Sequence, residues 1–198
     1  MAGRALQDAP EVQVDSLAEL RDWLTVNHGR GSGIWLVTFK QADPDRYVAY
    51  KDIVDEALCF GWVDSLPRAK DADRTMLYLS PRKAGSNWSR VNKAKVDRLE
   101  AEARMAEPGR RVVARAKADG TWTALDDVEN LVLPPDLAAA FDTRPDLLSV
   151  WEGWPRSVKR GALEILLNAR RSATRSARIA TILESAERGE RPFQWRKT

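Results

Sequence analysis

The chain contains one cysteine, Cys59, and one histidine, His28, among its 198 residues. A single cysteine excludes a disulfide bond within the chain and removes the usual argument for secretion. A single histidine excludes metal sites that need two imidazole ligands, and one cysteine cannot supply a cysteine-rich zinc site. We therefore predict no metal site and no cofactor.

Long hydrophobic runs are also missing. The longest apolar runs, at residues 34–39 and 57–63, are far shorter than the roughly 20 residues that span a bilayer. The N-terminal segment carries acidic side chains early and lacks the apolar region of a signal peptide. These absences predict a cytoplasmic protein with no membrane span.

Tryptophan is abundant, with eight residues against seven for tyrosine and phenylalanine together, and charge alternates in blocks. The net charge is −4 over residues 1–81, +7 over 82–117, −7 over 118–154 and +7 over 155–198. Either basic helices pack against acidic segments of the same fold, or both basic blocks face one polyanion. No helix-turn-helix, zinc finger or aromatic RNA-binding motif supports the second interpretation, so nucleic acid is only a secondary candidate partner.

The hydrophobic pattern of the first half predicts an α+β fold. Helices are expected over residues 16–27, capped by Ser16 in a capping box with Glu19, and over 50–60. Strands are expected over 34–40, 62–66 and 74–80, with Pro67 ending the second. The result is a small antiparallel sheet of about three strands packed with helices.

The second half is predicted to be helical. Ser86 is expected to cap a helix that reaches about residue 106, and further helices are expected over 108–118, from Pro134, from Pro145, over 156–170 and over 172–188. We predict an α+β domain over residues 1–120 and a helical region over residues 121–198. The acidic stretch 119–133 is the expected boundary.

The first candidate site is the segment Ala57–Ser65. A helix, a glycine and a strand follow one another here, and Trp62 and Asp64 fall on the same face of the strand. A carboxylate beside an indole in a partly dry position is suited to general acid or base catalysis. The structural alternative is that Asp64 binds the following turn or pairs with Arg74 across the hairpin.

The second candidate site is the segment Ser80–Asn92. A strand ends, a glycine-containing loop follows and a helix begins, which is a geometry that binds anions through free backbone N–H groups. The side chains that complete it are Arg82, Lys83, Ser86 and Ser89. Trp88 and Asn92 are expected to share a helix face. The structural alternative makes Ser86 a cap and Trp88 part of the core.

The two segments flank the same hairpin, so their side chains are candidates for one shared cleft around Trp62, Asp64, Arg82, Trp88 and Asn92. Near the C-terminus, Thr174, Arg175 and Arg178 form a secondary candidate anion site. A solvated helix face is the alternative there. Cys59 falls in an apolar helical stripe and is expected in the core.

Three segments resemble the bacterial YdeI/OmpD-associated family. The segment Tyr50–Ser65, with the core Ala57-Leu-Cys-Phe-Gly-Trp-Val-Asp64, and the segment Ser80–Asn92 are close to its signatures. The segment Ala169–Ile179 is similar to its C-terminal pattern, with Arg170 where lysine is commoner. The resemblance covers about Leu17 to Arg188.

This resemblance implies a role in bacteriocin protection and suggests links to resistance, but it implies no particular reaction. The recurring polar and aromatic positions of the family fall on Tyr50, Glu56, Trp62, Asp64, Arg74, Arg82, Ser86, Trp88, Ser89 and Asn92. The resemblance therefore adds these residues as candidates for ligand binding.

Three functions remain as hypotheses. The first is a protein that binds a small-molecule or peptide ligand in a tryptophan-lined pocket and protects its host. The alternative is a cofactor-independent enzyme that uses Asp64 as general acid or base and Arg82 as anion stabiliser. A second alternative is a nucleic-acid or protein adaptor built on the two basic blocks.

Overall fold

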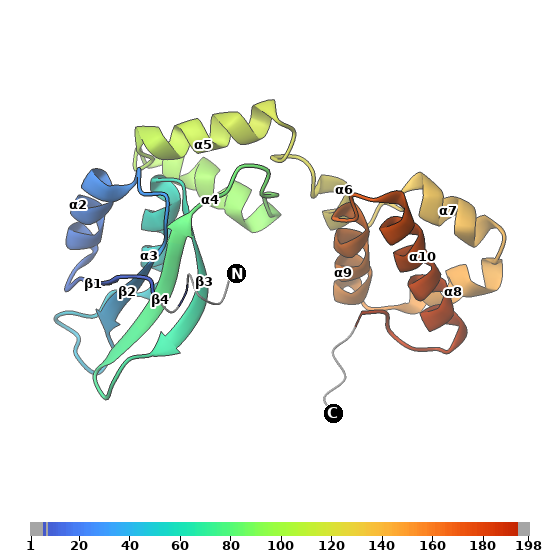
Figure 1. The fold of residues 1–198 in the computed structure, drawn as a ribbon, viewed down its shortest axis with the longest axis horizontal. Coiled ribbons are helices and arrows are strands. Elements are labelled where there is room, and N and C mark those ends of the chain that lie inside the picture. The colour runs from blue at the N-terminus through green and yellow to red at the C-terminus, as the bar shows by residue number, and fades with distance from the viewer. Residues whose placement is uncertain (1–5, 7, 194–198) are drawn as a thin grey trace. The chain divides into compact units, whose positions relative to one another are not determined.

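The structure is a computed structural model that describes residue 6 and residues 8–193. The chain forms two compact units, Met1–Thr123 and Ala124–Thr198, called here the N-terminal and C-terminal units (Figure 1). Each unit has a hydrophobic core of its own. The assignment of residues 1–120 and 121–198 as two domains stays a prediction, because compactness alone does not establish independent folding.

The N-terminal unit is built on a four-stranded sheet. Its elements are β1 (Glu11–Gln13), α2 (Leu17–Asn27), β2 (Ile34–Phe39), α3 (Tyr50–Cys59), β3 (Trp62–Ala69), β4 (Arg74–Pro81), α4 (Arg90–Ala101) and α5 (Glu107–Ala118). The strand order is β1-β2-β4-β3, with β1 parallel to β2 and the other neighbours antiparallel. The α+β class is confirmed, whereas the prediction of an antiparallel sheet of about three strands is wrong, because the sheet is mixed and has four strands. The fourth strand, β1, has three residues, too few to show the alternation that identifies a strand.

The strand β2 is buried along its whole length because its two faces pack into two different hydrophobic clusters. Ile34 and Leu36 belong to the main core, which includes residues of α2 and α3. Trp35 and Val37 belong to a smaller cluster with Met76. Successive strand residues point to opposite faces, so this one strand contributes to both clusters.

The strand β3 continues past Pro67 to Ala69, so the prediction that Pro67 ends it is wrong. A proline is tolerated there because β3 lies at the edge of the sheet, where an N–H group need not be donated to a neighbour. The register of β3 with β4 shifts between Asp64 and Pro67, which marks a β-bulge next to the proline.

The start of α2 agrees with the prediction. The Ser16 hydroxyl accepts a hydrogen bond from the Glu19 N–H at 3.2 Å, which confirms Ser16 as the N-cap. The Glu19 carboxylate accepts from the N–H of Asp15 at 2.9 Å, one residue earlier than in a standard capping box.

The start and end of α4 differ from the prediction. The helix begins at Arg90 with Ser89 as N-cap and ends at Ala101, so a cap at Ser86 and an end near residue 106 are both wrong. The chain before Ser89 is not helical because it turns first: Gly85 has φ of +74°, and Ser86 donates its N–H to the Lys83 carbonyl at 3.3 Å.

The C-terminal unit is helical. Its elements are α6 (Asp126–Glu129), α7 (Pro135–Asp142), α8 (Pro145–Gly153), α9 (Arg156–Leu167) and α10 (Ser172–Glu187). The predicted helices from Pro145 and over 172–188 are confirmed, and α9 ends three residues earlier than expected. Its core contains Phe141, Trp151 and Trp154 in ring contact. Across the described part of the chain, no helix has the length and apolar character needed to cross a membrane.

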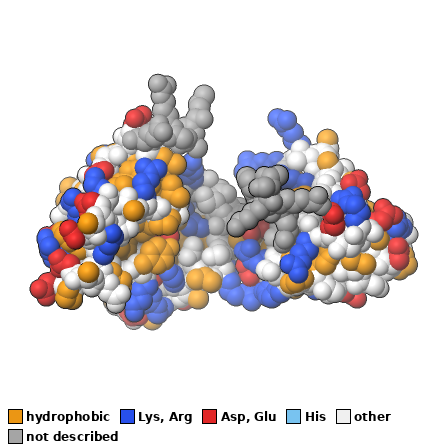
Figure 2. Space-filling view, turned by 90° about the horizontal axis from the view of Figure 1, so that it is seen from below, with side chains coloured by type: hydrophobic (Ala, Val, Ile, Leu, Met, Phe, Trp, Pro, Cys, Tyr) orange, Lys and Arg blue, Asp and Glu red, His pale blue; other side chains and the backbone are white. Residues whose placement is uncertain are grey.

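The charge blocks are partly paired within the fold. In the C-terminal unit, Arg156 and Arg160 contact the Glu129 carboxylate at 3.5 and 2.7 Å, and Arg175 binds Asp136. These contacts join the last basic block to the acidic block before it. On the N-terminal unit, acidic and basic side chains are interspersed over the face seen in Figure 2. The interpretation that basic helices pack against acidic segments is confirmed for these pairs.

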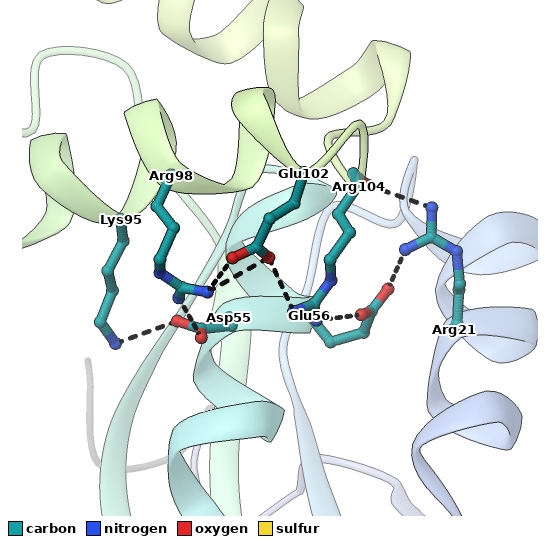
Figure 3. Close-up of polar contacts among 7 residues, drawn as sticks. All are labelled: Arg21, Asp55, Glu56, Lys95, Arg98, Glu102 and Arg104. Carbon is teal, nitrogen blue, oxygen red and sulfur yellow. Dashed lines mark hydrogen bonds and ion pairs between the residues drawn. The ribbon is translucent and has the colours of Figure 1, made fainter.

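A buried carboxylate, Glu56, joins three parts of the N-terminal unit (Figure 3). Its side chain is 2% exposed and binds Arg21 of α2 at 2.5 Å and Arg104, which follows α4, at 3.1 Å. Arg21 also donates to the Arg104 carbonyl oxygen at 3.1 Å. Both oxygens of the Glu56 carboxylate are therefore paired, as a buried charge requires.

The neighbouring residue Asp55 extends this network to α4 (Figure 3). It contacts Arg98 at 2.5 Å and Lys95 at 3.4 Å. Glu102 bridges Arg98 and Arg104 at 3.1 and 3.4 Å. Together these contacts fix α3 against α4 and against the segment that leads into α5.

We expect Glu56→Gln to lower the free energy of unfolding by about 3 kcal/mol, the lower end for a broken buried ion pair, because both arginines stay partly hydrated. Urea denaturation of the full chain measures this loss. The control is Glu100→Gln, which removes a half-exposed pair with Arg110 and should cost less than about 1 kcal/mol. Equal losses in the two variants would contradict the structural role of Glu56.

Candidate ligand-binding site

The two sequence segments predicted to carry chemistry meet at one end of the β3–β4 hairpin. Trp62, at the start of β3, is the register partner of Pro81, at the end of β4. The next residue, Arg82, donates its N–H to the Gly61 carbonyl oxygen at 2.9 Å. Strand pairing alone therefore brings Trp62 beside Arg82.

The helix α5 packs directly over this junction. A Cβ atom added at Gly109 would lie 2.1 Å from the Cys59 carbonyl oxygen, and one added at Gly61, where φ is +76°, would lie 2.7 Å from Val112. Only glycine permits these approaches at both positions. The N–H of Ala106 also bonds to the Cys59 carbonyl at 3.1 Å. The start of α5 is thus fixed on the end of α3.

A pocket of about 450 Å³ lies between α5, the α3–β3 connection and the end of β4. We call it the Arg82 pocket. From α5 it receives Pro108, Arg111, Val112 and Arg115, whose spacing of three, one and three residues defines one helix face. The residues that line it are His28, Phe60, Gly61, Trp62, Pro81, Arg82, Pro108, Arg111, Val112 and Arg115.

Arg82 is a partly buried cation without a paired carboxylate among the described residues. One terminal nitrogen, Nη2, donates to the Asn87 carbonyl at 2.6 Å, and the guanidinium carbon lies 3.9 Å from the centre of the Trp88 ring. Its Nε is buried and has no hydrogen-bond partner in the described part of the chain. Burial lowers the pKa of Arg82, which means that its positive charge is destabilised where it lies.

The two tryptophans predicted to face a ligand are buried instead. Trp62 and Trp88 are each 1% exposed. The Trp62 indole N–H donates to the His28 carbonyl at 3.1 Å, and the Trp88 ring lies 5.0 Å from that of Trp122. Trp62 still borders the Arg82 pocket, whereas Trp88 does not line it and instead packs its ring against the Arg82 guanidinium. The expectation that Trp88 shares a helix face with Asn92 is wrong, because α4 begins after Trp88.

Asp64 lies apart from the Arg82 pocket. Its carboxylate accepts a hydrogen bond from the hydroxyl of Tyr50, the first residue of α3, at 2.5 Å. This bond and the carboxylate charge raise the pKa of Tyr50 to about 12. Arg74 pairs with Asp71 at 2.6 Å, so the alternative that it pairs with Asp64 is wrong. The role of Asp64 as general acid or base stays a prediction.

The remaining candidates of the N-terminal unit take part in local structure. Glu56 is enclosed by Arg21 and Arg104, Ser89 caps α4, and Ser86 and Lys83 lie in the turn before it. The expected place of Cys59 in the core is confirmed, since its side chain is fully buried. Burial raises the pKa of the Cys59 thiol to about 11, so this cysteine stays protonated and unreactive at neutral pH.

The two arginines of the secondary candidate site near the C-terminus donate hydrogen bonds to groups of the C-terminal unit itself. Arg175 donates to both Asp136 carboxylate oxygens, with 2.8 Å between Nη2 and Oδ1, and to the Leu166 carbonyl at 2.9 Å. This pairing lowers the pKa of Asp136. Arg178 donates to the Ile165 carbonyl, and Thr174 is exposed. The two arginines therefore satisfy carbonyl groups at the end of α9.

Sequence reasoning missed His28, Arg111 and Arg115 as neighbours of Arg82. The four-residue spacing of Arg111 and Arg115 places them on one helix face, and this signal was available in the sequence. Their approach to Arg82 depends on the contacts of Gly61 and Gly109, which only the fold reveals. Over residues 6 and 8–193, no group of histidine, cysteine, aspartate and glutamate side chains is arranged to hold a metal ion.

We expect Trp62→Ala and Trp88→Ala each to lower the free energy of unfolding by about 3–5 kcal/mol, because each removes a fully buried indole. Chemical denaturation of the full chain measures both losses. Trp122→Ala, at a half-buried ring, is the control and should cost less. Losses below those of the control would mean that the two indoles face an open pocket.

We expect Asp64→Asn to lower the pKa of Tyr50 from about 12 toward the ordinary tyrosine value, because the neighbouring negative charge is lost. Ultraviolet titration of phenolate absorbance measures this change, and Tyr50→Phe identifies the transition. Because the pKa is raised on folding, the stabilisation is complete below pH ~10 and is lost as the pH rises toward the folded value. An unchanged titration in Asp64→Asn would contradict the contact.

Comparison with known proteins gives two family matches. Residues 12–112, just over half of the chain, match a domain of unknown function (DUF8412), and residues 130–189 match the family described as bacteriocin-protection, YdeI or OmpD-associated. No curated protein and no solved structure matches the chain. The segments Tyr50–Ser65 and Ser80–Asn92 fall within the first match, and Ala169–Ile179 falls within the second. The chain thus belongs to the DUF8412 family, and its residues 130–189 are similar to the YdeI/OmpD-associated family.

Proposed function

We propose that this protein binds a small molecule or a peptide group in the Arg82 pocket and acts in protection against a toxic compound. The observation that carries the proposal is Arg82 itself. It is a partly buried cation on a pocket wall, its Nε lacks a hydrogen-bond partner within the described residues, and its charge is destabilised by burial. The buried Nε is out of reach of a ligand, but an anion in the pocket would supply the opposite charge that this cation lacks.

The composition of the pocket wall supports ligand binding. Val112 and two prolines provide apolar surface, the almost fully buried rings of Phe60 and Trp62 border the same space, and a few polar groups converge on it. Pockets that bind small molecules have this mixture of apolar walls and a small number of placed polar groups. A volume of about 450 Å³ is within the range of such sites.

The protective role rests on the family match and not on the pocket. Residues 130–189 match a family described as bacteriocin-protection, and these residues form most of the C-terminal unit. A protein that binds its ligand without turnover fits the description as bacteriocin-protection. Asp64, the predicted general acid or base, does not line the Arg82 pocket, and this favours binding over catalysis there. The enzyme and the adaptor remain as outcomes that the experiment below distinguishes.

The test is a thermal-shift screen of the full chain against peptide antibiotics, aromatic natural products, acidic metabolites and short duplex DNA. A ligand at 100 times its Kd stabilises the folded state by about 2.7 kcal/mol. For a chain of this length, this corresponds to a rise in melting midpoint of roughly 5–10 °C. Ligands that give such a shift are then incubated with the protein and recovered, and unchanged ligand distinguishes binding from turnover.

Two variants at one position connect the shift to the pocket. Val112→Phe fills the Arg82 pocket and should abolish the ligand-induced shift, whereas the matched control Val112→Ala leaves the space open and should retain it. The melting midpoint of each variant without ligand is measured first, because Val112 also packs on Gly61. A shift that persists in Val112→Phe, or a shift with DNA alone that disappears at high salt, would contradict the proposal.

A further inference from the structure

The Arg82 pocket is lined by three arginines and one histidine, which come from three separate parts of the chain. Arg82 follows β4, Arg111 and Arg115 come from α5, and His28 ends α2. None of the ten residues that line the pocket is acidic. Positive groups that converge on a space without a lining carboxylate produce a field that favours an anion.

The carboxylates outside the pocket wall compensate these cations weakly. Glu107 lies 3.6 Å from Arg111 in a pair in which both side chains are more than half exposed. Asp119 interacts with Arg115 but accepts its hydrogen bonds from Thr121, at 2.6 and 3.0 Å. Exposed pairs of this kind contribute little energy, so a bound anion can replace them.

The arginines are arranged for an anion with several oxygens. Arg111 and Arg115 are one helical turn apart and point from the same face of α5. Each guanidinium is a planar fork of N–H donors that matches the oxygens of phosphate or carboxylate. Arg82 is held in place by the Asn87 carbonyl and the Trp88 ring, so little of its mobility is lost on binding.

His28 supplies a fourth polar group. Its Nδ1 lies 3.1 Å from the Thr25 carbonyl oxygen. A carbonyl oxygen only accepts, so Nδ1 carries a proton and donates it in this bond. In the neutral ring the other nitrogen, Nε2, then accepts and does not donate, so His28 lines the pocket without donating a hydrogen bond to a bound anion.

We propose, building on ligand binding in the Arg82 pocket, that the ligand carries a phosphate group, bound by Arg82, Arg111 and Arg115 with His28 beside them. Three guanidinium groups suit a dianion with three free oxygens better than a carboxylate, which has one charge and two oxygens. The pocket of about 450 Å³ is larger than a phosphate group alone, and much of its wall is apolar. The ligand class is therefore a phosphomonoester of a small apolar or aromatic group.

The test compares four probes by isothermal titration calorimetry on the full chain: phenyl phosphate, inorganic phosphate, benzoate and phenol. Phenyl phosphate should bind most tightly, inorganic phosphate more weakly because it lacks the apolar part, and benzoate at least about tenfold more weakly than phenyl phosphate. Phenol should give no measurable binding. Benzoate binding as tightly as phenyl phosphate, or no binding by either phosphate, would overturn the assignment.

Variants on one helix test the named residues. Arg111→Gln and Arg115→Gln should each weaken phenyl phosphate binding by about tenfold or more. Arg110→Gln removes the same charge from α5 at a residue that pairs with Glu100 and does not line the pocket, so it should change the affinity less than about threefold. Equal losses in all three variants would indicate a diffuse charge effect and overturn the site.

The two proposals fail in different ways. If a neutral ligand gives a shift that Val112→Phe abolishes, and phenyl phosphate does not bind, then ligand binding in the Arg82 pocket stands and the phosphate assignment is wrong. If phenyl phosphate binds equally well to Val112→Phe and to the unmodified chain, the pocket is not the binding site and both proposals are wrong.

Discussion

The carboxylate of Glu56 is the charge around which the N-terminal unit is organised. It is 2% exposed, and the guanidinium groups of Arg21 and Arg104 pair with its two oxygens. Arg104 lies at the entrance to α5, so the position of that helix depends on a charge in α3. From there α5 is held on the end of α3 by the close approach of Gly109, and its arginines reach the start of β3 and the end of β4. The Arg82 pocket is therefore a consequence of how Glu56 is neutralised.

The N-terminal unit contains two kinds of buried charge: charges that are paired within the fold, and a charge that has no carboxylate partner. The network around Glu56 and Asp55 brings together several ionisable side chains and resembles an active site in composition (Figure 3). Its charges compensate one another across three segments, as a structural network requires. Arg82 has no carboxylate partner in the described structure. A site that binds a ligand must leave some interaction energy unsatisfied in the free protein, and Arg82 does so while Glu56 does not.

The sequence patterns predicted most of the helices and strands, but they did not predict which distant side chains pair, and the reason is physical. The strands predicted at 34–40 and 74–80 and the cap at Ser16 follow from local patterns, and the structure has the cap and, to within one residue, both strands. The strand β1 was missed because three residues carry no period. Glu56 was expected to bind a ligand, but its partners lie 35 and 48 residues away, and no local pattern reports such distances. Local sequence patterns do not show which residues far apart in the chain will contact one another, and the candidate site is formed by such contacts.

The basic block over residues 82–117 shows how two interpretations of one charge pattern apply to different residues. Arg98, Arg104 and Arg110 bind carboxylates of the same unit, as expected if charge serves the fold. Arg82 and Arg115 line the pocket without a direct ion pair to a carboxylate of the described residues. In the last basic block, Arg160 and Arg175 are held by acids of the preceding segment. The net charge of a block therefore reports neither fold nor function. What separates them is whether a partly buried cation has a counter-charge of its own, and within the described structure Arg82 has no carboxylate partner.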